Sequence, residues 1–333
     1  MSAMNVGAAR RVHSLGLAGR LGLCVGLACA SLLSSVVAPA AEPAAASAPA
    51  PVIQPKTFAT PEKAAEAAIL AAERFDVPAM KEILGTDGMD LVVTEDPVQD
   101  KNRAAKFAEL ARQRTRIVRD STNTKVAHLV IGDDEWPWPI PIVEKDGKWH
   151  CDTAAGRQEI LYRRIGENEL EAIEMCRGYV EAQYEYASER HDGARINQYA
   201  QRTISTPGKQ DGLAWRAADG TWQGPVGEGA AEAIEKGYTD KSSPYNGYYF
   251  KVLKKQGPHA PMGEMDFVVQ GMMIGGFAFV AAPADYAVTG VKSFIVSHDG
   301  VVYEKDLGPK TLELFRAMDV YDPDSTWNPV VSP

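Results

Sequence analysis

The sequence has few of the residues, and none of the short motifs, that usually identify an enzyme. It contains six histidines and four cysteines in 333 residues, and no two histidines are spaced like the ligands of a metal site. A Gly-x-Ser-x-Gly nucleophile elbow, a phosphate-binding glycine loop and a dinucleotide fingerprint are all missing. The sequence therefore predicts no metal and no cofactor, and we expect a non-catalytic protein.

The chain also lacks any cluster of basic residues. It has 35 lysines and arginines against 44 aspartates and glutamates, a net charge of −9. Nucleic acids and anionic membrane surfaces attract basic patches, so neither is an expected partner. The expected partner is therefore an unidentified envelope protein or a small ligand.

Acidic residues are absent from the first forty positions, which instead carry three arginines and an apolar run over Leu21–Val37. Ala38-Pro39-Ala40 follows, with the small residues that signal peptidase requires. Residues 1–40 are therefore predicted to be a signal peptide cleaved between Ala40 and Ala41. The mature protein would be periplasmic or secreted, with no stable membrane insertion.

Two alternatives to the cleaved leader stay open. A retained membrane anchor is one, although the apolar run is shorter than the roughly 20 residues of a spanning helix. A lipoprotein attached through Cys29 is the other. Residues 41–56 consist mainly of alanine, proline and serine, which predicts a flexible linker.

Cys151 and Cys176 are the cysteines that remain after cleavage. A disulfide between them is one expectation, since an exported protein folds where disulfides form. Two buried free thiols are the other, because cysteine also serves as a small hydrophobic residue.

Residues 57–156 follow an α+β pattern. Thr60 and Pro61 are a cap and a first helical residue, Asp76-Val77-Pro78 restarts a helix that ends at Gly85, and a third helix is predicted over 102–113. Strands are predicted over 125–131, 140–143 and 149–152, the last two joined by a turn at Asp146-Gly147. Helices followed by a curved antiparallel sheet are expected.

Residues 157–333 predict a second α+β lobe. Apolar residues recur at helical spacing over 158–190, with a break at Gly166. Strands are predicted over 248–253, 276–281, 291–296 and 301–303, and a short helix over 309–318. A long helix and an antiparallel sheet are expected.

Three groups of residues are candidates for a site, each with a plainer structural interpretation. The first is a run of carboxylates beside two tryptophans, which suits acid–base chemistry or ligand binding but also an acidic turn at a sheet edge. The second is a pair of strand histidines, and the third a set of tyrosines with Trp215 and Trp222 upstream, which suits a carbohydrate or peptide groove. The candidates are Asp133, Asp134, Glu135, Trp136 and Trp138, then His128 and His150, then Tyr245, Tyr248 and Tyr249.

Several segments resemble a bacterial family of exported proteins known as domain of unknown function 2950. They are Trp136–Pro141, Asp152–Ile160, Ser205–Leu213, Gly247–Phe250 and Asp299–Tyr303. The resemblance covers about residues 57–330 and implies export and a bacterial source. It implies no particular activity.

The second lobe also resembles the globular domain of a type IV pilin or type II secretion pseudopilin. The residues that carry this resemblance are Asn168–Ile173 and Ala182–Ala187, followed by Gly247–Phe250, Ala278–Pro283 and Gly290–Phe294. A pilin has its assembly helix directly before this lobe, whereas here a complete lobe precedes it. The first lobe is similar in pattern to the cone-shaped proteins related to nuclear transport factor two.

The leading hypothesis is an exported, non-catalytic binding or assembly accessory of a Gram-negative-type envelope. The first alternative is a hydrolase or isomerase with a pocket in the first lobe. The second is a pseudopilin-like structural subunit.

Overall fold

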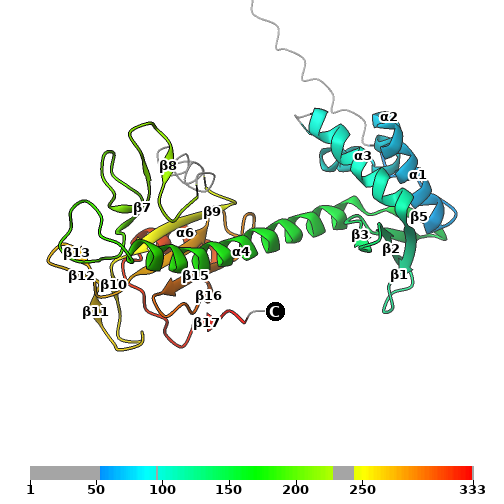
Figure 1. Ribbon diagram of the computed structural model, residues 1–333. Helices are drawn as coiled ribbons and strands as arrows, with labels where there is room; N and C mark the ends of the chain where they lie inside the picture. The colour runs from blue at the N-terminus through cyan, green and yellow to red at the C-terminus, as the bar shows by residue number, and fades with distance from the viewer. Residues whose placement is uncertain (1–52, 95–96, 228–243, 332–333) are drawn as a thin grey trace, which may run out of the picture. The chain divides into compact units, whose positions relative to one another are not determined.

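A computed structural model describes residues 53–94, 97–227 and 244–331 (Figure 1). The predicted signal peptide, its cleavage site and Cys29 lie outside these residues. The α+β class is confirmed, because helices accompany several antiparallel sheets. Buried hydrophobic residues form two separate clusters, one from residues 64–151 and one from residues 172–327. They are called here the N-terminal core and the C-terminal core.

Three helices and one 3-10 helix precede the first sheet: α1 (Pro61–Arg74), α2 (Val77–Leu84), η1 (Thr86–Leu91) and α3 (Pro97–Gln113). The predicted cap at Thr60 is confirmed, and Asp76, where a second helix was predicted to restart, also acts as a cap. The Thr60 hydroxyl accepts a hydrogen bond from the Lys63 N–H, and the Asp76 carboxylate accepts one from the Ala79 N–H. Helix α3 begins at Pro97, five residues before the predicted start.

The first sheet has the order β1-β2-β4-β5, with β3 also paired to β2. Its strands are β1 (Thr115–Arg119), β2 (Val126–Ile131), β3 (Trp136–Pro137), β4 (Ile142–Lys145) and β5 (Lys148–Cys151). Ala127, Leu129 and Ile131 on β2 are buried and alternate with less buried residues. One face of the sheet therefore carries the N-terminal core and contacts α1, α2 and α3.

Helix α4 (Thr153–Tyr186) is one continuous helix of 34 residues, and Gly166 does not interrupt it (Figure 1). It begins at Thr153 because the Asp152 carboxylate caps the Ala155 N–H. The predicted lobe boundary after residue 156 therefore falls inside its first turn. Gly156 packs against Ile140, which brings this turn onto the N-terminal core.

The chain after α4 contains short strands followed by a larger antiparallel sheet. The short strands are β6 (Arg202–Ile204), β7 (Gly212–Arg216), β8 (Trp222–Gln223), β10 (Lys255–Gln256), β11 (Met265–Asp266), β12 (Val268–Val269) and β13 (Met272–Met273). The larger sheet contains β9 (Tyr248–Leu253), β14 (Ala278–Pro283), β15 (Lys292–Ser297), β16 (Tyr303–Asp306) and β17 (Asn328–Pro329), in the order β17-β16-β15-β14-β9.

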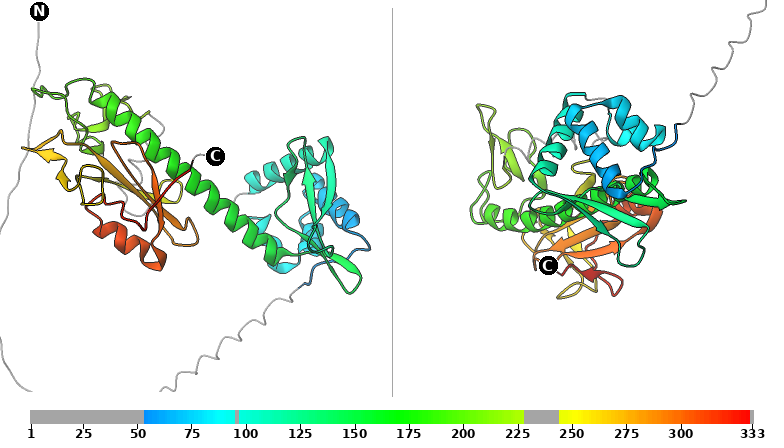
Figure 2. Two further views of the ribbon diagram at one scale, coloured as in Figure 1. Left: turned by 90° about the horizontal axis from the view of Figure 1, so that it is seen from below. Right: turned by 90° about the vertical axis from the view of Figure 1, so that its right-hand side faces the viewer.

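Both faces of this larger sheet are covered. The 3-10 helix η2 (Gly308–Lys310) leads into α6 (Thr311–Ala317), which lies on the face opposite α4 (Figure 2). Phe279 on β14 stacks on Tyr179 of α4, with 4.0 Å between ring centroids. Tyr249, whose side chain emerges from the other face, stacks near Phe315 of α6. All six residues of β14 are consequently buried.

The two cysteines are free and buried, so the disulfide interpretation is corrected in favour of two thiols. Cys151 ends β5 in the N-terminal core, whereas Cys176 lies on α4 in the C-terminal core. The helical residues from Thr153 to Cys176 extend about 35 Å at ~1.5 Å per residue. A disulfide requires Cα atoms within about 7 Å.

Residues 53–56, which the sequence placed in the linker, are hydrogen-bonded to α2 and η1. The Ile53 N–H donates to the Thr86 hydroxyl, the Thr86 N–H donates to the Ile53 carbonyl, and the Lys56 N–H donates to the Glu82 carbonyl. Across the described ranges, no helix combines the length and the apolar composition needed to cross a membrane.

Candidate functional site

A mainly apolar pocket of about 360 Å³ lies among α1, α2, α3 and the segment from Trp136 to Pro139. Helix α1 turns alanines toward this space, among them Ala68, Ala71 and Ala72. Because an alanine side chain is a single methyl group, α1 leaves room that leucine or phenylalanine would fill. The volume falls within the roughly 300–1,000 Å³ of small-molecule sites.

Asp100 on α3 is the buried charge in this pocket. Only 2% of the residue is exposed. Its carboxylate accepts hydrogen bonds from the Thr94 N–H at 2.6 Å and the Thr94 hydroxyl at 2.9 Å. Arg103, one turn further along α3, has a guanidinium nitrogen 3.8 Å from the same carboxylate. These contacts offset the cost of burying a carboxylate.

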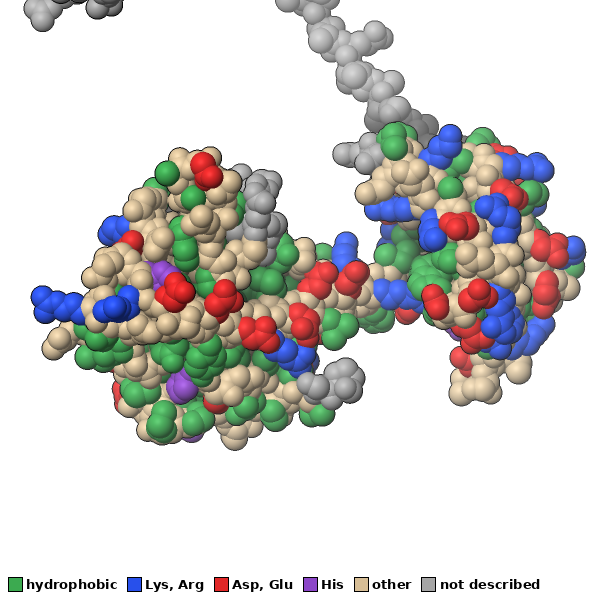
Figure 3. Space-filling view, in the orientation of Figure 1, with side chains coloured by type: hydrophobic (Ala, Val, Ile, Leu, Met, Phe, Trp, Pro, Cys, Tyr) green, Lys and Arg blue, Asp and Glu red, His purple; other side chains and the backbone are tan. Residues whose placement is uncertain are grey.

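Aromatic side chains form another wall. Trp138 is buried and lies 5.8 Å from Phe107 of α3, measured between ring centroids. Trp136 is 41% exposed, and the Arg163 guanidinium of α4 lies 5.5 Å from its ring. The space-filling view shows hydrophobic side chains exposed together on the part of the molecule that contains the N-terminal core, with acidic and basic side chains around them (Figure 3). Both predicted tryptophans thus line the pocket.

The predicted carboxylates do not line it. Asp133, Asp134 and Glu135 are exposed in the turn between β2 and β3. The Glu135 carboxylate lies 3.3 Å from a guanidinium nitrogen of Arg114 and 3.0 Å from one of Arg116. This arrangement matches the acidic-turn interpretation.

The predicted histidines do not meet either. His128 on β2 and His150 on β5 are separated by β4, and the pairing register offsets them along the sheet. Both alternate with the buried residues of their strands, so they lie on the face away from the N-terminal core. Within the described residues, no group of three or more His, Cys, Asp or Glu is arranged to hold a metal ion.

The three predicted tyrosines belong to the C-terminal core or pack against it. Tyr248 is 1% exposed, its hydroxyl donates to the Lys292 carbonyl at 2.8 Å, and burial raises its pKa far above the ordinary value. Tyr245 pairs with Tyr248 through backbone hydrogen bonds, and Tyr249 packs near Phe315. The interpretation of tyrosines as sheet anchors fits this packing.

Sequence reasoning missed the pocket's polar group and most of its wall. Asp100 lies before the start of the predicted third helix, and its hydrogen-bond partner Thr94 lies outside all the predicted helices. One signal in the sequence that could have indicated the pocket was the alanine face of α1. A helix with a wide alanine stripe packs closely against its neighbours at some positions and leaves space at others. The two tryptophans gave the other signal.

The fold and pocket define an α+β protein with two cores and an apolar ligand-sized pocket in the first. The chain matches the family described as "Protein of unknown function (DUF2950)" over residues 55–330, which is most of its length, and it belongs to that family. No curated protein and no solved structure matches it.

Proposed function

We propose that this protein binds a small, mostly apolar molecule in the pocket of the N-terminal lobe. The observation that carries the proposal is the pocket itself: about 360 Å³, walled by alanines, Phe107, Trp136 and Trp138. Such a pocket removes apolar ligand surface from water, which contributes about 25 cal/mol per Å². Asp100 and Arg103 provide one polar end that would orient the ligand.

Binding is favoured over catalysis by where the candidate residues lie. The three predicted carboxylates face solvent, and the two histidines lie on the opposite face of the sheet from the core. An acid or base needs to be within hydrogen-bond reach of its substrate. The hydrolase or isomerase alternative therefore has Asp100 as its candidate within the pocket, already engaged by Thr94.

The test fills the pocket and measures a neutral fluorescent probe, N-phenylnaphthylamine. Ala104 lines the pocket, whereas its neighbour Ala105 is exposed on the same helix. Ala104→Phe should weaken saturable probe binding at least tenfold, and Ala105→Phe should leave it unchanged. Circular dichroism and the Tm of both variants control for folding. Equal binding by the two variants, or no saturable binding by the wild type, refutes the proposal.

We also propose that the protein acts outside the cytoplasm, in the periplasm or beyond. The basic, then apolar, then small-residue order of residues 1–40 supports this. Intact mass of protein recovered from the periplasm should correspond to a chain that starts at Ala41. A lipidated Cys29 or an intact leader would instead support a tethered protein.

The pseudopilin-like alternative has one supporting observation, the packing of α4 across an antiparallel sheet. Its assembly would require the leader to be retained or processed at its front. A mature chain that starts at Ala41 would eliminate it.

A further inference from the structure

The apolar pocket of the N-terminal lobe has two lining residues that reach solvent, and they mark its mouth. The side chain of Arg103 on α3 is 62% exposed, and Trp136 on β3 is 41% exposed. The other described residues of the lining, Asp100 and Trp138 among them, are buried or half-buried. A ligand that fills the pocket would therefore have its last atoms beside Arg103 and Trp136.

Arg103 is the group at this mouth that has hydrogen-bond donors to offer. A guanidinium carries five N–H donors and no acceptor. The contact of Arg103 with the Asp100 carboxylate is 3.8 Å long, which is beyond hydrogen-bond distance. Arg103 makes no hydrogen bond within the part of the chain that the structure describes. Its donors are therefore available to a ligand.

Asp100 holds this guanidinium near the pocket without being available to a ligand itself. Only 2% of Asp100 is exposed, and its carboxylate already accepts the two hydrogen bonds from Thr94. Its negative charge, one helical turn before Arg103, attracts the guanidinium toward the pocket. The charge that the pocket presents to a ligand is consequently positive.

A second guanidinium, that of Arg163 on α4, lies at the same indole but is already engaged. It lies 5.5 Å from the ring centroid of Trp136, and its nitrogens donate to the Glu159 carboxylate and to the Pro137 carbonyl, each at 2.8 Å. Glu159 balances its charge. Arg103 is thus the cation at the mouth that a ligand can pair with.

The interior suits one alkyl chain. Its walls include the side chains of Ala68, Ala71, Ala72, Phe107 and Trp138, which offer no charge. The volume of about 360 Å³ is near the lower end of the roughly 300–1,000 Å³ of ligand sites, so one chain fits better than the two chains of a membrane lipid.

We propose that the ligand of this pocket is a single-chain amphiphile with a carboxylate head, as in a fatty acid. This inference rests on the proposed binding of an apolar molecule and adds the chemistry of its polar end. The chain would occupy the pocket, and the planar guanidinium of Arg103 can donate two parallel hydrogen bonds to the carboxylate at the mouth. The Trp136 indole, which is part apolar and part exposed, would cover the carbons nearest the head.

Displacement of N-phenylnaphthylamine by three ligands with the same alkyl chain tests the head group. Decanoate, decanol and decylammonium differ in charge at neutral pH. The wild type should bind decanoate about tenfold more tightly than decanol, because a hydrogen-bonded ion pair adds to the same apolar contact, and it should bind decylammonium most weakly. Added salt should weaken the binding of decanoate but not that of decanol.

Arg103→Gln removes the charge and keeps much of the side chain. It should lower the ratio of decanoate affinity to decanol affinity about tenfold, and Arg103→Lys should retain part of the ratio, because lysine keeps the charge without the fork. The ratio is the quantity measured because damage to the pocket weakens both ligands. Lys101→Gln is the matched control: it removes a charge from an exposed position on α3 outside the lining, and the ratio should stay at the wild-type value. Circular dichroism verifies the fold of each variant.

The failure of this inference and the failure of the proposed function give different results. If the wild type binds neither N-phenylnaphthylamine nor decanol, the proposed function fails and the inference fails with it. If both neutral ligands bind but decanoate binds no more tightly than decanol, or Arg103→Gln leaves the ratio unchanged, the inference alone is wrong. Tighter binding of decylammonium than of decanoate would also overturn it, because Asp100 would then select the ligand.

Discussion

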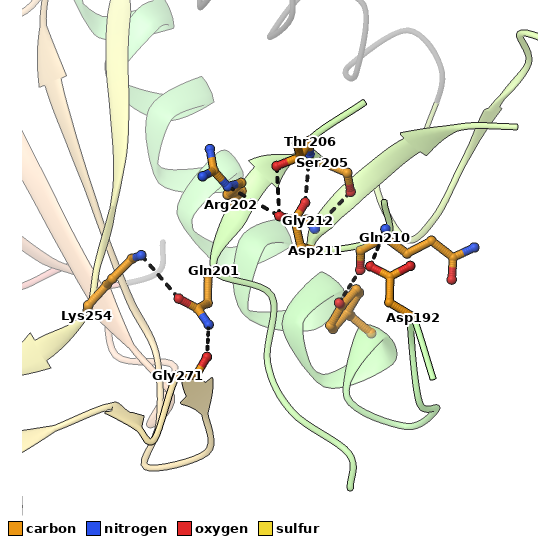
Figure 4. Close-up of polar contacts among 11 residues, drawn as sticks. Asp192, Gln201, Arg202, Ser205, Thr206, Gln210, Asp211, Gly212, Lys254 and Gly271 are labelled. Carbon is orange, nitrogen blue, oxygen red and sulfur yellow. Dashed lines mark hydrogen bonds and ion pairs between the residues drawn. The ribbon is translucent and has the colours of Figure 1, made fainter. Parts of the chain in front are cut away.

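Aspartate–threonine pairs fix loops throughout the described chain. In each pair the carboxylate accepts hydrogen bonds from both the N–H and the hydroxyl of one threonine. The pairs are Asp100 with Thr94, Asp120 with Thr122, Asp211 with Thr206, Asp219 with Thr221, and Asp324 with Thr326. Asp100 lies in the wall of the apolar pocket, and Asp211 closes the loop between β6 and β7 (Figure 4).

Asp211→Asn tests this contact at the residue scale. Burial alone would raise the pKa of Asp211, but the hydrogen bonds from Thr206 and the charge of Arg202 outweigh it and lower the pKa. Asparagine keeps the shape and loses the charge, so we expect the free energy of unfolding to fall by about 1–2 kcal/mol at neutral pH. Urea denaturation measures the change.

The contribution of Asp211 to the free energy of unfolding should depend on pH with a definite sign. Because the pKa is lower in the folded state, the carboxylate stabilises the fold above the unfolded value of about 3.9. This contribution is lost as the pH falls through the lower, folded pKa. The stability gap between wild type and Asp211→Asn should therefore narrow below about pH 4. Asp219→Asn, at an exposed turn, is the matched control, and we expect its free energy of unfolding to differ less from that of the wild type. A gap that stays constant at low pH would contradict the assignment.

At the scale of elements, α4 contains glycines in two different environments. A Cβ on Gly156 would lie 2.7 Å from Cγ1 of Ile140, whereas a Cβ on Gly166 would meet nothing within 4 Å. Gly166→Ala should stabilise the protein by up to about 1 kcal/mol through helix propensity. Gly156→Ala should destabilise it by about 1–3 kcal/mol through overpacking. Thermal unfolding of the two variants gives the comparison, and equal shifts in Tm would refute the close packing at Ile140.

Local signals made the element predictions that succeeded. Thr60 caps a helix as predicted, and a second helix begins after Asp76 as predicted. Asp146 and Gly147, with φ of 53° and 74°, form the expected hairpin turn. Strand β1 was missed because Thr115–Arg119 places arginines among few apolar residues. Its position is set by pairing with β2, a contact that periodicity does not encode.

The candidate site was predictable only in part for the same reason. Trp136 and Trp138 stand out in the sequence and do line the apolar pocket. Asp100 does not stand out, since its significance comes from burial beside α1 and from Thr94. The carboxylates at 133–135 look conspicuous together, yet a tight turn places them in solvent.

At the scale of the whole molecule, two cores with one cysteine each predict thiols that are protected by folding. Burial raises the pKa of Cys151 to about 12 and that of Cys176 to about 12. Neither thiol should react with iodoacetamide in the native protein, and both should react in urea. Mass spectrometry assigns the modified residues. A disulfide between Cys151 and Cys176, found by mass spectrometry before reduction, would contradict the separation of the two cysteines.

The stacking of Tyr179 on Phe279 joins residues about one hundred positions apart in the sequence. At about 5–20 residues per second, a ribosome would add Phe279 roughly 5–20 s after Tyr179. During that interval the buried stripe of α4, which includes Ile173 and Cys176, has no sheet to cover it. The C-terminal core, whose buried cluster extends to Trp327, can therefore close only when synthesis is nearly finished, whereas the N-terminal core is complete at residue 151.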